Sequence, residues 1–282
     1  MRGEFMISRR QLLKGAAVGT VAAAGLRADP LGMPIGCQLW PVRAMVGKDF
    51  EGTLGQLAAI GFKRVEMCSP ASYAEGFGKL AARKPAELRR TIEASGLACE
   101  SCHFGFKELK EHLDESIGWA SGIGLKQMVL STFGIPSAAA MADWVGAARQ
   151  LNTIAEQVNK AGMQMGFHNH QFEFKEIDGV LIYHKLMETL DPKLVKMQFQ
   201  VDVISLGYHA ADFLTKYPGR FLSLHLQDWS AAEKKDVAVG QGVVDWKQLF
   251  AAAKTGGVRN YFVELSLDDM KTSCAYLHEL KV

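Results

Sequence analysis

Residues 137–168, SAAAMADWVGAARQLNTIAEQVNKAGMQMGFH, contain the two patterns on which the fold depends. The part 137–161 is amphipathic with helical spacing, and Gly162 follows it as a helix C-cap. A short, mostly apolar run, 164–168, comes next and has the length of a buried strand. An amphipathic helix that leads through a glycine into a buried strand is one unit of a parallel sheet covered by helices.

The same unit recurs along the chain. Eight short apolar runs fit buried parallel strands: 35–39, 64–67, 98–103, 127–131, 164–168, 197–201, 221–226 and 261–265. The helical stretches end at or shortly before a glycine, and the clearest are 54–60, 85–95, 137–161 and 245–254. Eight such strands close a sheet into a barrel, so the pattern predicts an α/β fold, a (β/α)8 TIM barrel. No long linker interrupts it, which indicates a single domain over residues 29–282.

The N-terminus differs from the rest of the chain. Residues 8–14, SRRQLLK, precede a weakly hydrophobic run, 15–26, and small residues suited to cleavage near Ala24 or Ala28. This pattern resembles a twin-arginine export signal; an ordinary amphipathic helix start is the alternative. We interpret residues 1–28 as the signal, and expect a periplasmic or secreted protein.

The composition excludes several classes of partner. The 282 residues are 48% hydrophobic and 22% charged, with a net charge of +2, and Lys and Arg are scattered, so no nucleic-acid partner is expected. No apolar run approaches the ~20 residues of a membrane span, so no stable membrane insertion is expected. Five cysteines, an odd number, indicate no disulfide framework. Assembly into a homo-oligomer stays open.

Polar side chains follow the strands at the barrel end where chemistry takes place. Asp202, His225 and Glu264 end three consecutive predicted strands at the same height, so they can converge on one divalent metal ion. Carboxylates with an imidazole suit a hard or borderline ion such as Mn²⁺ or Mg²⁺. The candidates for a fourth ligand, all in or after the fifth strand, are His168, His170 and Glu173.

Each of these residues also has a structural interpretation. A single buried histidine such as His225 is more often a hydrogen-bonded core residue, and Asp202 fits a helix N-cap. Glu264 is harder to explain in this way, because a carboxylate inside a barrel is costly without a partner. His168 and His170 would share one strand face, which is unusual for packing alone. Together, the residues favour a metal site.

Four motifs carry a family resemblance: FHNHQFEF at 167–174, HLQDW at 225–229, VGQGVVDW at 239–246 and FVEL at 262–265. With them the chain resembles the sugar phosphate isomerase/epimerase family of xylose-isomerase-like TIM barrels. The resemblance covers essentially the whole mature chain. It implies one divalent metal ion, held by the strand-end residues Glu173, Asp202, His225 and Glu264.

The strand-five ligand has an alternative within the same resemblance. Relatives with a simple E-x-L-N strand place their glutamate where His168 stands here, so either Glu173 or His168 would be the ligand. Three carboxylates with one imidazole suit Mn²⁺, and Mg²⁺, Co²⁺ and Zn²⁺ are the alternatives.

The resemblance implies isomerase or epimerase chemistry. The metal would polarise a sugar carbonyl and stabilise the enediolate that forms when a neighbouring proton leaves. We expect His170 and Glu264 to exchange protons with the substrate, and His168, with His103, to orient its hydroxyl groups.

Other strand-end residues are expected to bind the substrate, although packing would also explain several of them: Gln38, Trp40, Glu66, His103 and Gln227. Gln227 stands where many relatives have lysine, which weakens the inference of a phosphate or carboxylate substrate. Export points the same way, because sugar phosphates are cytoplasmic. The expected substrate is therefore an unphosphorylated sugar or keto-sugar.

Three other functions remain open. The same site could act as a 3-keto-glycoside lyase or hydrolase, by losing a leaving group β to the acidic proton. A DNA-repair function like that of the apurinic endonucleases in the superfamily would need three zinc ions and more strand-end histidines. A barrel that binds sugar without catalysis is the third alternative.

Overall fold

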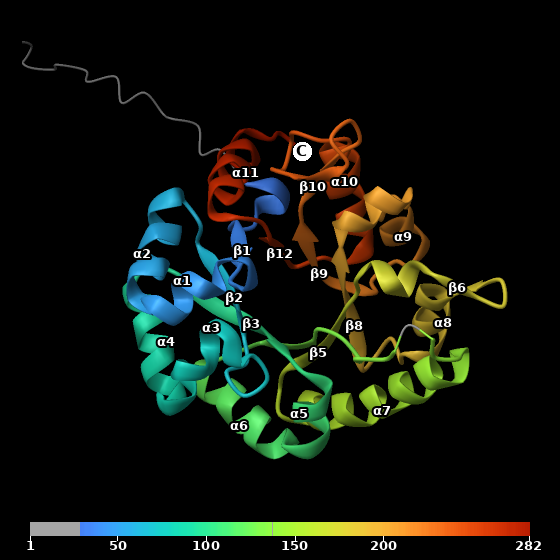
Figure 1. Ribbon diagram of the computed structural model, residues 1–282, viewed down its shortest axis with the longest axis horizontal. Coiled ribbons are helices and arrows are strands. Elements are labelled where there is room, and N and C mark those ends of the chain that lie inside the picture. Colours follow the sequence, from blue (N-terminus) through green and yellow to red (C-terminus); the bar gives the residue numbers. More distant parts are fainter. Residues whose placement is uncertain (1–28, 137) are drawn as a thin grey trace, which may run out of the picture.

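The computed structural model describes residues 29–136 and 138–282. Eight parallel strands form a closed barrel in the order β1-β12-β9-β8-β5-β4-β3-β2. They are β1 (Gly36–Gln38), β2 (Arg64–Cys68), β3 (Ala98–Phe104), β4 (Gln127–Leu130), β5 (Gln164–His168), β8 (Val195–Gln200), β9 (Phe221–Leu226) and β12 (Asn260–Val263). The helices surround the strands (Figure 1). The predicted (β/α)8 TIM barrel is confirmed.

The helices and the shorter elements follow the strands in turn. The α-helices are α1 (Arg43–Lys48), α2 (Phe50–Ile60), α3 (Ala74–Phe77), α4 (Pro85–Ala94), α5 (Phe106–Glu111), α6 (Leu113–Ile123), α7 (Met141–Lys160), α8 (Ile182–Thr189), α9 (Ala210–Lys216), α10 (Trp246–Gly256) and α11 (Leu267–Glu279). The 3-10 helices are η1 (Pro30–Gly32), η2 (Trp40–Val42), η3 (Gly78–Ala82), η4 (Gln171–Phe174) and η5 (Val201–Leu206). Two hairpins, β6 (Glu176–Ile177) with β7 (Val180–Leu181) and β10 (Asp228–Ser230) with β11 (Lys235–Val237), lie outside the barrel sheet.

All eight predicted strands are present, with ends shifted by two residues at most. The predicted helix 137–161 is shorter, because α7 begins at Met141. The carboxylate of Asp143 accepts a hydrogen bond from the Ala140 N–H (2.9 Å), which fixes the start of the helix. Conversely, α2 begins earlier than predicted, at Phe50, where Asp49 caps it by accepting from the Gly52 N–H (2.9 Å).

The apolar core lies mainly between the outer faces of the strands and the helices, as in other α/β barrels. The space inside the barrel is narrower than this outer core, and polar side chains line part of it. At the level of Gly166 the interior is tightly packed, because a Cβ at this position would lie 3.0 Å from side-chain atoms of both Leu222 and Val129. Above this level, toward the carboxyl ends of the strands, the interior carries polar side chains that form the site described below.

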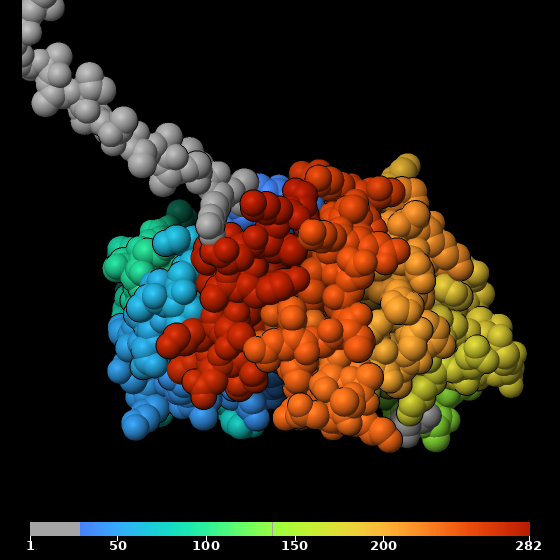
Figure 2. Space-filling model, turned by 90° about the horizontal axis from the view of Figure 1, so that it is seen from above, coloured from blue at the N-terminus to red at the C-terminus, as the bar shows by residue number. Residues whose placement is uncertain are grey.

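The two ends of the described chain meet where the barrel closes. Strand β1 pairs with β12, and His278 Nδ1 lies 2.7 Å from Asp29 Oδ1. Figure 2 shows the red helix α11 beside the blue N-terminal segments. The export signal predicted for residues 1–28 lies outside the described residues, so the domain boundary stays a prediction. The described residues contain no helix that is long and apolar enough to cross a membrane, and all five cysteines are free.

Candidate functional site

A carboxylate lies at the centre of the barrel, surrounded by hydrogen-bond donors from four strands. Glu66, on β2, accepts hydrogen bonds from Gln38 Nε2 (2.8 Å), Ser101 Oγ (2.5 Å) and Gln198 Nε2 (2.8 Å). Gln198 also donates to Ser223 Oγ (2.8 Å). All five side chains have no exposed surface. We call this group, Gln38, Glu66, Ser101, Gln198 and Ser223, the polar floor.

Three histidines stand on the polar floor. His103 comes from β3, His168 from β5 and His225 from β9, and one potential ligand atom of each lies within 4.8 Å of the others. Their ring centroids are 4.5 to 5.1 Å apart. This histidine cluster could hold a divalent metal ion, because buried imidazole nitrogens at such spacing are typical metal ligands.

His225 is held between two carboxylates. Its Nε2 lies 2.5 Å from Glu66 Oε2, and its Nδ1 lies 2.9 Å from Glu264 Oε2, just beyond β12. Burial alone would lower the pKa of His225, but the charges of Glu264 and Glu66 raise it to about 10. Gln200 Nε2 also donates to Glu264 Oε2 (2.7 Å). In the absence of a metal ion, a protonated imidazole therefore links the two carboxylates.

Two further carboxylates lie on the 3-10 turns that follow β5 and β8. Glu173, on η4, accepts from the His170 N–H (2.7 Å), and burial raises its pKa to about 8, with a contribution from the charge of Asp202. Asp202, on η5, accepts from Gln171 Nε2 (3.2 Å), and burial raises its pKa to about 7. The charge of Glu264 also raises the pKa of Asp202, so the acidic groups act on one another at the same end of the barrel.

Several buried polar atoms at this end have no hydrogen-bond partner among the described residues. They come from the segments that follow or end β5 and β8, and they are His168 Nδ1, Asn169 Nδ2, His170 Nδ1, Glu173 Oε1, Gln200 Oε1 and Asp202 Oδ1. Buried polar groups in native proteins are nearly always paired, so a cluster of unpaired ones indicates a place for a ligand or ion.

His170 combines an unpaired nitrogen with a neutral ring. Its ring stacks on Phe172 (5.0 Å between centroids) and meets His168 edge-on (4.7 Å). Burial lowers the pKa of His170 to about 4. The ring is therefore neutral at physiological pH and can accept a proton, which is compatible with the predicted acid–base role but does not test it.

The structure brings the predicted metal ligands to one end of the barrel, but only His225 and Glu264 are in direct contact. Burial raises the pKa of Glu173, and the charge of Asp202 adds to this effect. The alternative strand-five ligand, His168, lies in the histidine cluster. The roles assigned to these residues stay predictions.

The residues expected to bind substrate occupy four different places. Gln38 and Glu66 belong to the polar floor, below the histidines, and His103 belongs to the histidine cluster itself. Gln227 follows β9 and is 6% exposed. Trp40 packs at the rim, edge-on to Tyr73 (5.4 Å) and beneath Arg43 (4.2 Å).

Neither Gln198 nor Gln200 was among the site residues predicted from the sequence. Both are buried, and both bind a carboxylate of the site: Gln198 binds Glu66 and Gln200 binds Glu264. The signal for them was present in the segment KMQFQ at 196–200, where glutamines alternate with apolar residues at the period of a strand. Two inward-facing amides are unusual in an otherwise apolar strand.

The motifs HLQDW and VGQGVVDW meet at Asp228, which is 1% exposed. Its Oδ1 accepts from the N–H groups of Trp229 (2.9 Å) and Val244 (3.0 Å), and its Oδ2 from Gly240 N–H (3.0 Å) and Trp246 Nε1 (2.8 Å). Asp228 therefore holds the long loop between β9 and α10 in place. The expected role of this loop in approaching substrate stays a prediction.

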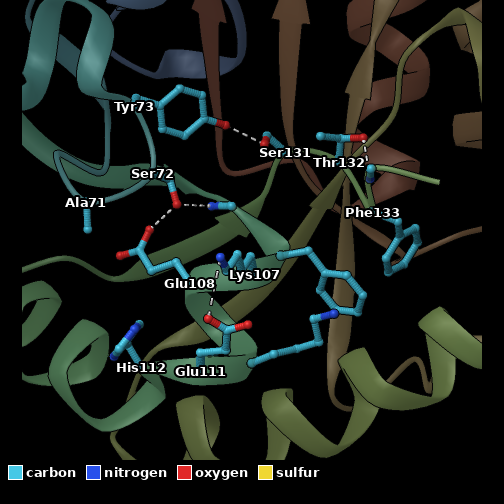
Figure 3. A pocket seen from close by; sticks show the side chains of 14 residues that line it. Ala71, Ser72, Tyr73, Lys107, Glu108, Glu111, His112, Ser131, Thr132 and Phe133 are labelled. Atoms are coloured by element: carbon cyan, nitrogen blue, oxygen red, sulfur yellow. Dashed lines mark hydrogen bonds and ion pairs between the residues drawn. The ribbon is translucent and has the colours of Figure 1, made fainter. Parts of the chain in front are cut away.

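A pocket of about 720 Å³ lies on the same face of the barrel, between the loops that follow β2, β3 and β4 (Figure 3). On its wall Glu108 accepts from the hydroxyls of Ser72 and Ser69, and Tyr73 donates to Ser131. One of its lining residues, Gly105, is two positions after His103 in the sequence, and His103 itself does not line the pocket. It is lined by Ala71, Ser72, Tyr73, Gly105, Phe106, Lys107, Glu108, Lys110, Glu111, His112, Ser131, Thr132, Phe133 and Gly134.

Comparison with known proteins confirms the signal. The twin-arginine translocation pathway signal sequence matches residues 6–25, which indicates export. No curated protein sequence matches the chain.

Solved structures of sugar phosphate isomerases/epimerases and of xylose-isomerase domain proteins are among those similar to this one. A sugar phosphate isomerase/epimerase from Parabacteroides distasonis is 21% identical, with a TM-score of 0.73 over 87% of this chain and 93% of that one. The IOLI protein with a bound zinc atom is 12% identical, with a TM-score of 0.62 over 87% and 96%. A D-psicose 3-epimerase, solved in the presence of D-fructose, is 11% identical, with a TM-score of 0.59 over 87% and 96%. The chain shares the fold of these proteins.

Proposed function

We propose that this protein is a metal-dependent isomerase or epimerase that acts on an unphosphorylated sugar or keto-sugar through an enediolate intermediate. The observation that carries the proposal is the cluster of unpaired buried polar atoms beside His225 and Glu264. Such a cluster provides both ion ligands and hydrogen-bonding groups for a polyhydroxylated substrate. The sugar isomerases and epimerases with this fold support the same reaction class.

The residues present fit a divalent ion. Glu173 and Asp202 each have a buried oxygen without a partner. Burial raises the pKa of both side chains, and a bound cation would lower these pKa values again. With His225 and Glu264 they make a set of three carboxylates and one imidazole, which suits Mn²⁺. Participation of His103 and His168 would favour Zn²⁺, the metal named for one structure with this fold. When bound, the ion would polarise the substrate carbonyl.

The chain's own groups would move the protons. His170, neutral because burial lowers its pKa to about 4, would accept the proton from the carbon beside the carbonyl at its unpaired Nδ1. Glu264 is the candidate for returning a proton, and His168 would orient a hydroxyl group through its own unpaired Nδ1.

Charge favours a neutral substrate. The mouth of the site carries Glu173, Asp202 and Glu264, which disfavour a phosphate even after one divalent ion is bound. Gln227 adds no positive charge. The match to the twin-arginine signal supports export, which would separate the protein from cytoplasmic sugar phosphates, and a periplasmic or secreted protein is part of this proposal.

Elemental analysis and hydrogen exchange test this proposal together. The mature protein should carry one Mn²⁺ or Zn²⁺ per chain, and in deuterated water it should exchange a hydrogen beside the carbonyl of a keto-sugar such as D-fructose. Faster exchange of the matching sugar phosphate would contradict the assigned substrate. Three zinc ions per chain would support the DNA-repair alternative, and sugar binding without exchange would support a non-catalytic barrel.

A second candidate function is 3-keto-glycoside lyase activity, which the neighbouring pocket favours. The pocket is lined in part by the segment that follows β3, the strand of His103, and could hold the unit attached to the reacting sugar. In this reaction the proton beside the carbonyl leaves, the C–O bond to the β-positioned aglycone breaks, and the aglycone oxygen takes a proton. Release of 4-nitrophenol from a 3-keto-glucoside of this phenol would identify lyase activity, and exchange without release would identify the isomerase or epimerase.

A further inference from the structure

Glu66 lies directly under the histidine cluster but is closed to solvent. We propose that Glu66 is a positioning residue: it fixes the proton of His225 on Nε2, so that Nδ1 is the nitrogen that His225 presents to a metal ion. This inference rests on the metal-dependent function proposed above, and it assigns Glu66 a role other than substrate contact.

The carboxylates of Glu66 and Glu264 lie at different distances from the ring nitrogens of His225. Two ligand atoms that are each about 2.0–2.2 Å from one ion lie roughly 3 Å or more apart. His225 Nδ1 and Glu264 Oε2, at 2.9 Å, match such a pair. His225 Nε2 and Glu66 Oε2, at 2.5 Å, are too close and instead share a proton. Glu66 therefore orients the ring, and Glu264 lies on the side where the ion would bind.

The position of Glu66 is itself fixed. Gln38 from β1, Ser101 from β3 and Gln198 from β8 donate to its two oxygens, so the carboxylate is held from three sides. Because all three of these partners are donors, both oxygens of Glu66 act as acceptors. A carboxylate that accepts the second N–H of a ligating histidine holds the ring and raises its basicity.

The same carboxylate also determines the state of His103 through Gln198. The NH₂ group of Gln198 donates to both Glu66 and Ser223, so its two hydrogens are used on this side. The amide oxygen of Gln198 then faces His103 Nε2, at 2.6 Å, and this nitrogen must carry the proton. His103 is left with Nδ1 as its free nitrogen, so one buried carboxylate sets the tautomers of two histidines in the cluster.

Metal binding to the full mature protein tests the inference. The metal-free protein is titrated with Co²⁺ alone, and the dissociation constant is measured by competition with a chelating dye. Glu66→Gln should bind Co²⁺ about 10- to 100-fold more weakly, the usual effect of removing such a partner. Ser101→Ala is the matched control, because it removes a donor to Glu66 without touching a histidine, and it should change the affinity by about threefold at most. Unchanged affinity of Glu66→Gln would overturn the inference.

A measurement on the wild-type protein does not depend on whether the variant folds. With ¹¹³Cd bound to ¹⁵N-labelled protein, the cadmium–nitrogen coupling should appear at Nδ1 of His225, while Nε2 retains its proton. Coupling at Nε2 would refute the positioning role of Glu66 even if the metal-dependent function holds. If the wild type binds neither Co²⁺ nor Cd²⁺, the proposed function fails first and the inference fails with it.

Discussion

Nδ1 of His225 lies 2.9 Å from Oε2 of Glu264, although the two residues are 39 positions apart in the sequence. The contact follows from the pairing of β9 with β12, in which His225 is opposite Phe262 and Glu264 comes just beyond the last pair. The Glu264 side chain is 14% exposed, so it connects the buried histidine with the open end of the barrel. Several of the consequences of this contact can be measured.

Glu264→Gln should abolish both metal binding and turnover. The glutamine keeps the shape of the side chain but removes the negative charge that holds His225 and accepts from Gln200. We expect metal affinity to fall by at least about a hundredfold, since a direct ligand is lost. Elemental analysis and hydrogen exchange on the same sample measure the two losses, and full activity in the variant would overturn the site.

The fold could be predicted from the sequence because buried parallel strands produce apolar runs and helices end at glycines. The composition of the polar floor could not be predicted, because it depends on register. The pairing of β2 with β3 shifts between Arg64 and Glu66, so Glu66 lies opposite Ser101. A regular register continued from Arg64 and Ala98 would have placed Glu66 opposite Glu100.

A second register shift completes the floor. Met197 pairs with Phe221, but the next residue, Gln198, pairs with Ser223, which places Gln200 beside His225. Bulges of this kind redirect side chains near functional sites, and a pattern of apolar and polar residues contains no signal for them. The strand ends that carry the carboxylates could therefore be predicted, whereas the two amides of β8 that hold them, Gln198 and Gln200, could not.

The stability of the metal-free protein should fall as the pH rises. The pKa values of Asp202 and Glu173 are raised from 3.8 and 4.5 to about 7 and about 8 in the folded protein. A carboxyl group with a raised pKa contributes stability that is complete below its unfolded pKa and is lost as the pH rises through its folded value. Below about pH 6.5 the lowered pKa values of three buried histidines, His103, His168 and His170, act in the opposite sense. The melting temperature of the metal-free protein should therefore decrease between pH 7 and pH 9.

The variant Asp202→Asn with Glu173→Gln isolates this effect. The pKa of His225 is also raised, and this residue lowers the melting temperature in the wild type and in the double variant alike. The quantity to compare is therefore the slope of melting temperature against pH in the two proteins. We expect a shallower decrease in the double variant. Parallel melting curves over the whole pH range would show that these carboxylates do not titrate as described.

His170→Ala should separate catalysis from metal binding. The side chain provides an unpaired Nδ1, whereas the bond to Glu173 comes from the backbone N–H and survives the substitution. If His170 is the general base, hydrogen exchange should slow by about 10²- to 10⁴-fold while metal content stays unchanged. Loss of the metal instead would identify His170 as a ligand, and normal exchange would eliminate it as the base.

Asp228→Asn should destabilise the protein without a change in metal ligands. Each oxygen of Asp228 accepts two N–H donors, and an amide nitrogen in place of one oxygen would face two donors within a buried site. Unsatisfied buried donors cost about 1–3 kcal/mol each, so the free energy of unfolding should fall by roughly 2–4 kcal/mol. Urea denaturation of the metal-free protein measures this change.

The matched control for that change is Asp245→Asn, in the same loop. Asp245 caps α10 by accepting from the Gln248 N–H (2.9 Å), and asparagine is an equally good N-cap. We expect this variant to lie within about 0.5 kcal/mol of wild type. Equal destabilisation by the two substitutions would mean that the loop responds to lost charge, whereas a large effect at Asp228 alone would establish that its four hydrogen bonds hold the loop between β9 and α10.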